Sequence, residues 1–267
     1  MKLGISYNIF DGEEMLPFSI NNLRPFAHHI SVVYQTTSNY GNACNPKLVE
    51  KLEMLLGYGL IDKLFLFEPE IRYEKNGKDI SWKSGMYNEQ QKREIGLKIS
   101  RANDCDAFLS LDCDELYDPK EFKFAMDEFE KGGFDTSFTK ILTYYKLPTM
   151  QLDPPEEYYA PLFYKIKTNT KYEFLDDYPV KIDRTRMVKA GHTRVFTRKE
   201  IQMYHYAYVR HNLKSKVKNS SAQSDVATGD LFISFFDKWN KAEDNAQLID
   251  GRRYGLIQVE NKFKIKI

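Results

Sequence analysis

The sequence predicts an α/β fold built on an open, mostly parallel sheet flanked by helices. Over the first 135 residues, short runs rich in β-branched and aromatic residues alternate with helical patterns. This alternation is typical of parallel strands joined by helical crossovers. After Gly132 and Gly133 it stops, and short strand-like runs separated by prolines predict an antiparallel, loop-rich elaboration followed by C-terminal helices.

The first half contains four predicted strands and three predicted helices. The strands are expected at residues 3–9, 30–34, 64–67 and 107–111, and the helices at 47–56, 85–102 and from 119 onward. The third helix has the clearest start, because Asp118 suits the N-cap, Pro119 the first helical position and Glu121 the third. The run at 64–67 is wholly apolar and therefore predicts a buried strand.

The second half is expected to add strands at 138–145, 160–166, 193–196 and 254–267, and helices at 207–219 and 229–242. We find no internal repeat and no Pro/Gly/Ser-rich linker. The chain is therefore expected to form a single domain over residues 1–267, with parts at 1–135, 136–220 and 221–267.

Composition excludes several classes of protein. The 39 lysines and arginines against 38 acids give a formal charge of +1, too small to attract nucleic acid, so no nucleic-acid partner is expected. Apolar runs are far shorter than the ~20 residues that span a bilayer, and the first ten residues do not resemble a signal peptide. Three cysteines without a C-x-x-C pair indicate reduced thiols and a cytoplasmic protein.

The sharpest chemical feature is the segment from Ala107 to Asp118. The predicted strand delivers Asp112 and Asp114 at its C-terminal end, where ligands bind in open α/β sheets. Carboxylate oxygens suit Mg²⁺ or Mn²⁺, with water and substrate phosphate as the other ligands. The alternative is that these acids only cap a helix or turn, but Asp118 already suits that role.

Two basic clusters accompany this motif. Lys92 and Arg93 lie on the helix that leads into the strand, where they either contact a diphosphate or sugar or form a solvated charged face. His205 precedes a predicted helix that carries Arg210 and Lys216, which could hold phosphate oxygens. His205 either completes a carboxylate metal site or packs among tyrosines as a structural residue.

Together these clusters resemble the GT-A glycosyltransferases, and within them the family 2-like enzymes of surface polysaccharide assembly. The resemblance covers about residues 2–220 and is strongest in three places. These are the stretch from Lys92 to Leu97 with Asp112 to Glu115, the stretch from His205 to Arg210, and Lys216 with Asn219, Ser220 and Ser221. The segment from Ile5 to Glu14 is similar to the nucleotide-binding first strand and loop of these enzymes.

The resemblance implies a metal-dependent transfer of sugar from a nucleoside diphosphate sugar, with uridine the preferred nucleoside, to a glycan or lipid-linked acceptor. Residues 1–135 would bind the donor, and residues 136–220 would form the acceptor side and close over metal and diphosphate. The implied metal ligands are Asp112, Asp114 and His205. The implied donor contacts are Ser6, Asn8, Glu14, Lys92, Asp112, Arg210 and Lys216. A cytoplasmic enzyme of this type can work at the inner face of the membrane.

The catalytic base is not marked by a motif. An inverting transferase needs a base beside the acceptor hydroxyl, and the loop-rich segment after residue 145 offers paired acids near aromatic residues. The candidates are Glu156, Glu157, Asp176 and Asp177, with Asp177 favoured over Glu157.

Two other functions remain open. A sugar nucleotidyltransferase normally has a glycine-rich, basic N-terminal loop, whereas the segment from Ser6 to Glu14 contains one glycine and no lysine or arginine. A non-catalytic carbohydrate-binding homologue could use the aromatic residues of the segment 140–178 to stack sugars. Fold alone does not separate these functions.

Overall fold

The computed structural model describes the chain apart from residues 72–73, 76–77, 80, 220–225, 241–244 and 267. Its central feature is a twelve-stranded mixed sheet, whose main path has the order β13-β14-β9-β8-β10-β6-β1-β2-β3. The parallel part consists of β1 (Leu3–Ile9), β2 (Ala27–Tyr34), β3 (Lys63–Leu66) and β6 (Ala107–Asp112). This sheet confirms the predicted α/β class and its mostly parallel core.

The remainder of the sheet is mainly antiparallel, as predicted for the second half. Its strands are β7 (Glu115–Leu116), β8 (Thr136–Tyr145), β9 (Met150–Asp153), β10 (Tyr159–Lys165), β11 (Thr193–Val195), β12 (Gln202–Tyr208), β13 (Asn245–Gln247) and β14 (Arg253–Gln258). A separate two-stranded ribbon joins β4 (Glu74–Lys75) to β5 (Lys78–Asp79). Strand β12 runs parallel to β8 and antiparallel to β7, which brings residues 202–208 beside the end of β6.

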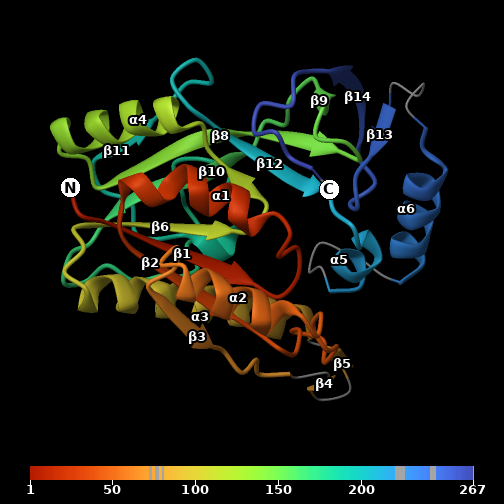
Figure 1. Ribbon diagram of the computed structural model, residues 1–267, viewed down its shortest axis with the longest axis horizontal. Coiled ribbons are helices and arrows are strands. Elements are labelled where there is room, and N and C mark those ends of the chain that lie inside the picture. Colours follow the sequence, from red (N-terminus) through yellow and green to blue (C-terminus); the bar gives the residue numbers. More distant parts are fainter. Residues whose placement is uncertain (72–73, 76–77, 80, 220–225, 241–244, 267) are drawn as a thin grey trace.

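Helices cover both faces of the parallel strands (Figure 1). The helices are α1 (Leu16–Leu23), α2 (Leu48–Gly57), α3 (Ser81–Ala102), α4 (Pro119–Lys131), α5 (Leu213–Asn219) and α6 (Val226–Lys238), with 3-10 turns at Arg24–Phe26 and Arg184–Arg186. Of these, α5 and α6 lie beside β13 and β14 and not over the parallel strands. The side chains of Leu3, Ile5 and Tyr7 pack in one apolar core with residues of α1, α2 and α4. Successive strand residues point to opposite faces, so the residues between them meet α3.

Helix α3 lies unusually close to β1 because small residues face one another. A Cβ atom added to Gly96 would lie 2.2 Å from Ser6 Oγ, and one added to Gly4 would lie 2.3 Å from Ser100 Oγ. The close approach sets Arg93 of α3 beside the end of β6. The packing of α3 against β1 therefore positions the buried guanidinium of Arg93 at the site described below.

Several predicted elements differ from the structure. Residues 207–208 belong to β12 and α5 begins only at Leu213, so the expected helix at 207–219 is wrong in its first part. Strand β14 ends at Gln258, although a strand was expected through 267. The strand β3 lies at the sheet edge with Phe65 39% and Leu66 42% exposed, which corrects its prediction as buried. A run of apolar residues indicates β propensity, but it does not show whether the strand lies at the centre or at the edge of the sheet.

Other differences concern short elements. Helix α1 and the strands β9 and β13 had no predicted counterpart, because each is too short for a periodic signal. The helix expected at 229–242 corresponds to α6, which ends at Lys238, so its predicted end is too late; residues 241–242 lie outside the described part of the chain. Ser220 and Ser221 lie outside it as well. Among the described residues, no helix combines the length and apolarity that crossing a bilayer requires.

Candidate functional site

The carboxyl ends of β1 and β6 open into a cavity of about 560 Å³. The two strands are paired in parallel so that Asn8 stands opposite Asp112, and both residues line the cavity. The opposite walls come from β8, β10, β12, the turn at 183–186 and the loop between β13 and β14. This is the position in which open α/β sheets bind ligands.

Asp112 is held by two arginines. Its Oδ2 lies 2.6 Å from Arg186 Nη2 and its Oδ1 lies 3.3 Å from Arg93 Nη2. Arg186 also contacts Glu115, at 2.9 Å from Oε2, and Glu115 Oε2 accepts the backbone N–H of Asp112 at 3.0 Å. Loss of solvent would raise the pKa of Asp112, but Arg186 and Arg93 outweigh it and lower the pKa to about 2.

Asp114 is buried and has cationic partners of its own. Its Oδ2 accepts hydrogen bonds from Arg210 Nη2 and from Lys216 Nζ, the latter at 3.2 Å. Arg210 is fixed a second time by Asp11, whose Oδ1 lies 2.8 Å from Nη1. Burial opposes ionisation of Asp114, yet Lys216 and Arg210 hold its pKa well below the usual range. The carboxylate is therefore charged at neutral pH.

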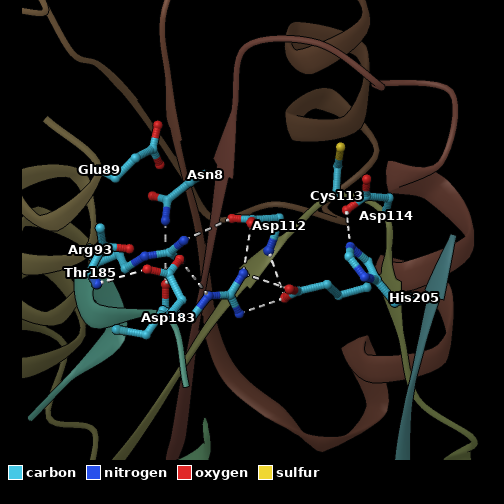
Figure 2. A network of polar contacts seen from close by, with 12 residues as sticks. Asn8, Glu89, Arg93, Asp112, Cys113, Asp114, Asp183, Thr185 and His205 are labelled. Atoms are coloured by element: carbon cyan, nitrogen blue, oxygen red, sulfur yellow. Dashed lines mark hydrogen bonds and ion pairs between the residues drawn. The ribbon is translucent and has the colours of Figure 1, made fainter. Parts of the chain in front are cut away.

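His205 lies on β12 and faces the other oxygen of Asp114. The distance from its Nε2 to Asp114 Oδ1 is 3.7 Å, which exceeds a hydrogen bond. Burial lowers the pKa of His205 to about 4 although Asp114 opposes the shift, so the imidazole is neutral at pH 7. Figure 2 shows Asp114 and His205 together on one side of Asp112, with Arg93 and Asp183 on the other.

The three predicted metal ligands differ in whether they have an atom free to bind a metal. Within the described part of the chain, no three His, Cys, Asp or Glu side chains converge as a metal cluster. A site completed by substrate phosphates and water needs only one or two protein carboxylates. Asp114 Oδ1 and the neutral His205 nitrogen fit such a site, whereas both oxygens of Asp112 are engaged by arginines.

Three predicted donor contacts, Ser6, Glu14 and Lys92, do not line the cavity. Ser6 is fully buried beneath Gly96 of α3. Glu14 Oε1 accepts the backbone N–H of His211 at 3.1 Å. Lys92 is also buried and donates to Gln35 Oε1 at 2.5 Å and to Glu89 Oε1 at 2.7 Å. Of these two partners Glu89 lines the cavity, so Lys92 contacts a cavity residue but does not line the cavity itself.

The four acids predicted as candidates for the catalytic base lie in different places. Only Glu156 lines the main cavity. Glu157 is exposed and paired with Lys140, and Asp176 is exposed and paired with Arg184 at 3.1 Å. Asp177 lines a second hollow together with Glu173, Leu175, Tyr178 and Lys189.

The structure adds site residues that sequence reasoning did not assign. They are Asp11, Asp183, Arg186, Asp250 and Arg252, all of which line the cavity. Each lies in a loop, a single turn or the edge of a short hairpin, where no periodicity marks a side chain's direction. The one sequence signal that could have indicated a site was the cluster of charged residues from Asp183 to Arg186. It lies between two regions without clear hydrophobic periodicity.

No protein-family model and no curated protein matches the chain. Among solved structures it is similar to residues 1–349 of TarS from S. aureus, at 12% identity and a TM-score of 0.48 over 78% of this chain and 61% of that one. It is also similar to GalNAc-T7 with UDP, GalNAc and Mn²⁺, at 11% identity and a TM-score of 0.43 over 91% and 48%. The chain thus spans less than two thirds of either structure. Likeness at these levels concerns the backbone and assigns no activity.

Proposed function

We propose that the chain is a metal-dependent glycosyltransferase that moves a sugar from a UDP-sugar to a glycan or lipid-linked acceptor. The observation that carries the proposal is the grouping of Asp114, His205, Arg210 and Lys216 at the carboxyl end of β6. Two metal-ligating groups there lie beside two fixed cations. This combination would stabilise a diphosphate leaving group, since its negative charge grows as the glycosidic bond breaks.

The charges of the cavity support a metal. Among the described residues that line it, eight are acids and five carry a guanidinium or ammonium group. The acids are Asp11, Glu89, Asp112, Asp114, Glu115, Glu156, Asp183 and Asp250, and the cations are Arg93, Arg186, Arg210, Lys216 and Arg252. A diphosphate would add negative charge to a cavity with excess carboxylates, and a divalent cation that binds with it would offset that charge.

Asp114 and His205 would hold this cation, and imidazole, a softer ligand than oxygen, favours Mn²⁺ over Mg²⁺. When bound, the metal supplies Lewis-acid stabilisation of the departing diphosphate. Arg210 and Lys216 hold phosphate oxygens through charge-assisted hydrogen bonds. Arg210 is pre-positioned for this because Asp11 and Asp114 bind it from two sides. Asn8, whose Oδ1 has no partner among the described residues, offers an acceptor to the nucleoside.

For the catalytic base of an inverting reaction, Asp183 is the best placed acid. It lines the cavity with its side chain 45% exposed. One oxygen accepts the backbone N–H of Thr185 at 2.8 Å, and the other lies 3.9 Å from Arg186 Nε, beyond a hydrogen bond. In contrast, Thr143 and Arg252 engage both oxygens of Glu156. Asp183 therefore keeps an oxygen that can accept a proton.

We place the enzyme in the cytoplasm, or at the inner face of the membrane, in the assembly of a surface polysaccharide. The three cysteines are free, which agrees with a reducing compartment.

The test is a transfer assay with purified protein, Mn²⁺, a panel of UDP-sugars, and free and lipid-linked glycan acceptors. Mass spectrometry should detect acceptors enlarged by one sugar together with released UDP. Pyrophosphate release from UTP and a sugar phosphate would instead identify a nucleotidyltransferase. Glycan binding without any turnover or nucleotide dependence would identify a carbohydrate-binding protein.

A further inference from the structure

One wall of the cavity is not used by the donor machinery. It is formed by Glu156, which precedes β10, and by Asp250 and Arg252 in the turn that joins β13 to β14. Figure 1 shows β13 and β14 at the end of the sheet that also carries α5 and α6. A late segment of the chain therefore completes a site whose donor half is built mainly from earlier strands.

Arg252 is the central residue of this wall. Its Nη2 donates to Glu156 Oε1 at 2.9 Å, its Nε to Asp250 Oδ2 at 2.7 Å, and its Nη1 to Tyr254 Oη at 2.9 Å. A guanidinium has five N–H donors, so two of them remain for a ligand. The side chain is 50% exposed, which leaves these donors accessible from the cavity.

Glu156 gives the arginine a fixed position. Its carboxylate is 11% exposed, and its second oxygen accepts a hydrogen bond from Thr143 Oγ1 at 2.6 Å. The backbone of the same residue is anchored by Arg198, whose Nη2 donates to Glu156 O at 2.8 Å. A guanidinium held in this way loses little conformational entropy when it binds a ligand.

The local charge selects the kind of ligand. On this wall the two carboxylates Glu156 and Asp250 share a single cation, Arg252, whereas Asp183 lies 3.9 Å from Arg186. Because an anionic ligand would meet an excess of carboxylates, the wall favours a neutral one. The two unused guanidinium donors lie beside carboxylate oxygens that each accept one hydrogen bond and keep a second lone pair, a set that matches vicinal hydroxyl groups. Tyr158 and Tyr159 also line the cavity and offer partly exposed rings against which a sugar can pack.

We propose that this wall is the acceptor subsite and that it takes a neutral sugar of a glycan, with Arg252 as the specificity-determining residue. Glu156 acts through Arg252 as a positioning residue. The inference rests on the proposed transferase function, because it assigns the donor to the other half of the cavity. It narrows the acceptor to an uncharged sugar unit at the reacting end, whether that glycan is free or lipid-linked.

The experiment is an array of neutral, phosphorylated and uronic-acid glycans probed with the whole protein in the presence of UDP and Mn²⁺. The variants are Arg252→Lys, Arg252→Ala and Glu156→Gln. Arg253→Ala is the matched control, since Arg253 is the exposed neighbour outside the cavity. UDP binding is measured on every variant by calorimetry, and thermal unfolding shows which variants are folded.

The wild-type protein should retain neutral glycans, and Arg252→Lys and Glu156→Gln should each weaken this retention by ~10-fold, as loss of one charge-assisted contact implies. With a glycan that is retained, the same variants should raise the acceptor KM more than they lower kcat. Arg253→Ala should behave as wild type.

Preferential retention of anionic glycans, or unchanged neutral binding in folded Arg252→Ala and Arg252→Lys, would overturn the acceptor assignment. A wild-type protein that binds UDP with Mn²⁺ but no glycan on the array would also contradict it, while leaving the donor site intact. Absence of UDP binding would instead contradict the transferase proposal itself.

Discussion

Arg186 joins Asp112 to Glu115 at the end of β6, with Nη2 at 2.6 Å from Asp112 Oδ2 and Nη1 at 2.9 Å from Glu115 Oε2. One guanidinium thereby bridges two carboxylates that lie three residues apart. The side chain of Arg186 is only 8% exposed, so few water molecules could replace it. Asp112, the first of the two acids at the end of β6, is thus held by a residue far along the chain.

Replacing this arginine should destabilise the fold. Arg186→Ala leaves Glu115 without its cationic partner and Asp112 with Arg93 alone. Removal of one partner of a buried ion pair costs about 3 kcal/mol of unfolding free energy. Urea unfolding measures this loss. The control is Arg184→Ala, because Arg184 is 51% exposed and its partner Asp176 is fully exposed, so a change of ~0.5 kcal/mol or less is expected. Equal stability of the two variants would contradict the role of Arg186.

Asp114→Asn should abolish most metal-dependent UDP binding. The amide retains the size of the carboxylate but removes the charge that holds the metal and the cations Arg210 and Lys216. We expect binding to fall by ~100-fold or more, measured by calorimetry in Mn²⁺, since at least 2.7 kcal/mol of charged contacts is lost. Asp127→Asn, at an exposed ion pair on α4, is the matched control and should bind UDP as wild type does. Retained binding in Asp114→Asn would exclude this carboxylate as a ligand.

His205→Ala separates metal binding from nucleoside binding. If the imidazole holds the metal, the variant should lose affinity for UDP in Mn²⁺ while its affinity for uridine stays the same. His211→Ala serves as control because the His211 side chain is exposed. Equal loss of UDP and uridine binding would indicate a structural role for His205.

The base is tested by Asp183→Asn. Transfer should fall by ~100-fold or more with UDP-sugar affinity retained, which is the low end of what general-base catalysis contributes. Asp177→Asn and Glu157→Gln are the controls, because each also replaces an acid by its amide but lies outside the main cavity. Both variants should transfer sugar at a nearly normal rate. A large loss in either control would return the base to the segment that the sequence favoured.

Sequence reasoning located the parts of the site that regular elements carry. Strand β1 was predicted with its observed bounds, and Asp118 does cap α4 by accepting the N–H groups of Lys120 and Glu121. Asp112 ends β6 and Asp114 follows it, as expected for the C-terminal end of the strand, since alternation and capping are local signals. The pairing of β12 with β7, which brings His205 to Asp114, is long-range and left no local signal.

The sequence could not predict which charges neutralise one another. Asp114 was expected at an open, ligand-facing strand end, yet it is 3% exposed and enclosed by Arg210 and Lys216. Arg186 and Arg252 reach the cavity from a turn and a hairpin edge. In such segments the sequence has no hydrophobic periodicity from which the direction of a side chain could be predicted. Such residues depend on how distant segments pack, which only the folded chain shows.

The most direct test of the donor site is a thermal-shift panel of UDP-, GDP-, CMP- and dTDP-sugars, each with Mn²⁺ and with EDTA. A ligand that binds only the folded state at 100 times its Kd stabilises it by about 2.7 kcal/mol. The account predicts that a UDP-sugar raises Tm in Mn²⁺, that EDTA removes the shift, and that Asp114→Asn does not show it. A shift of equal size in EDTA, or no shift with any nucleotide sugar, would contradict a metal-dependent donor site.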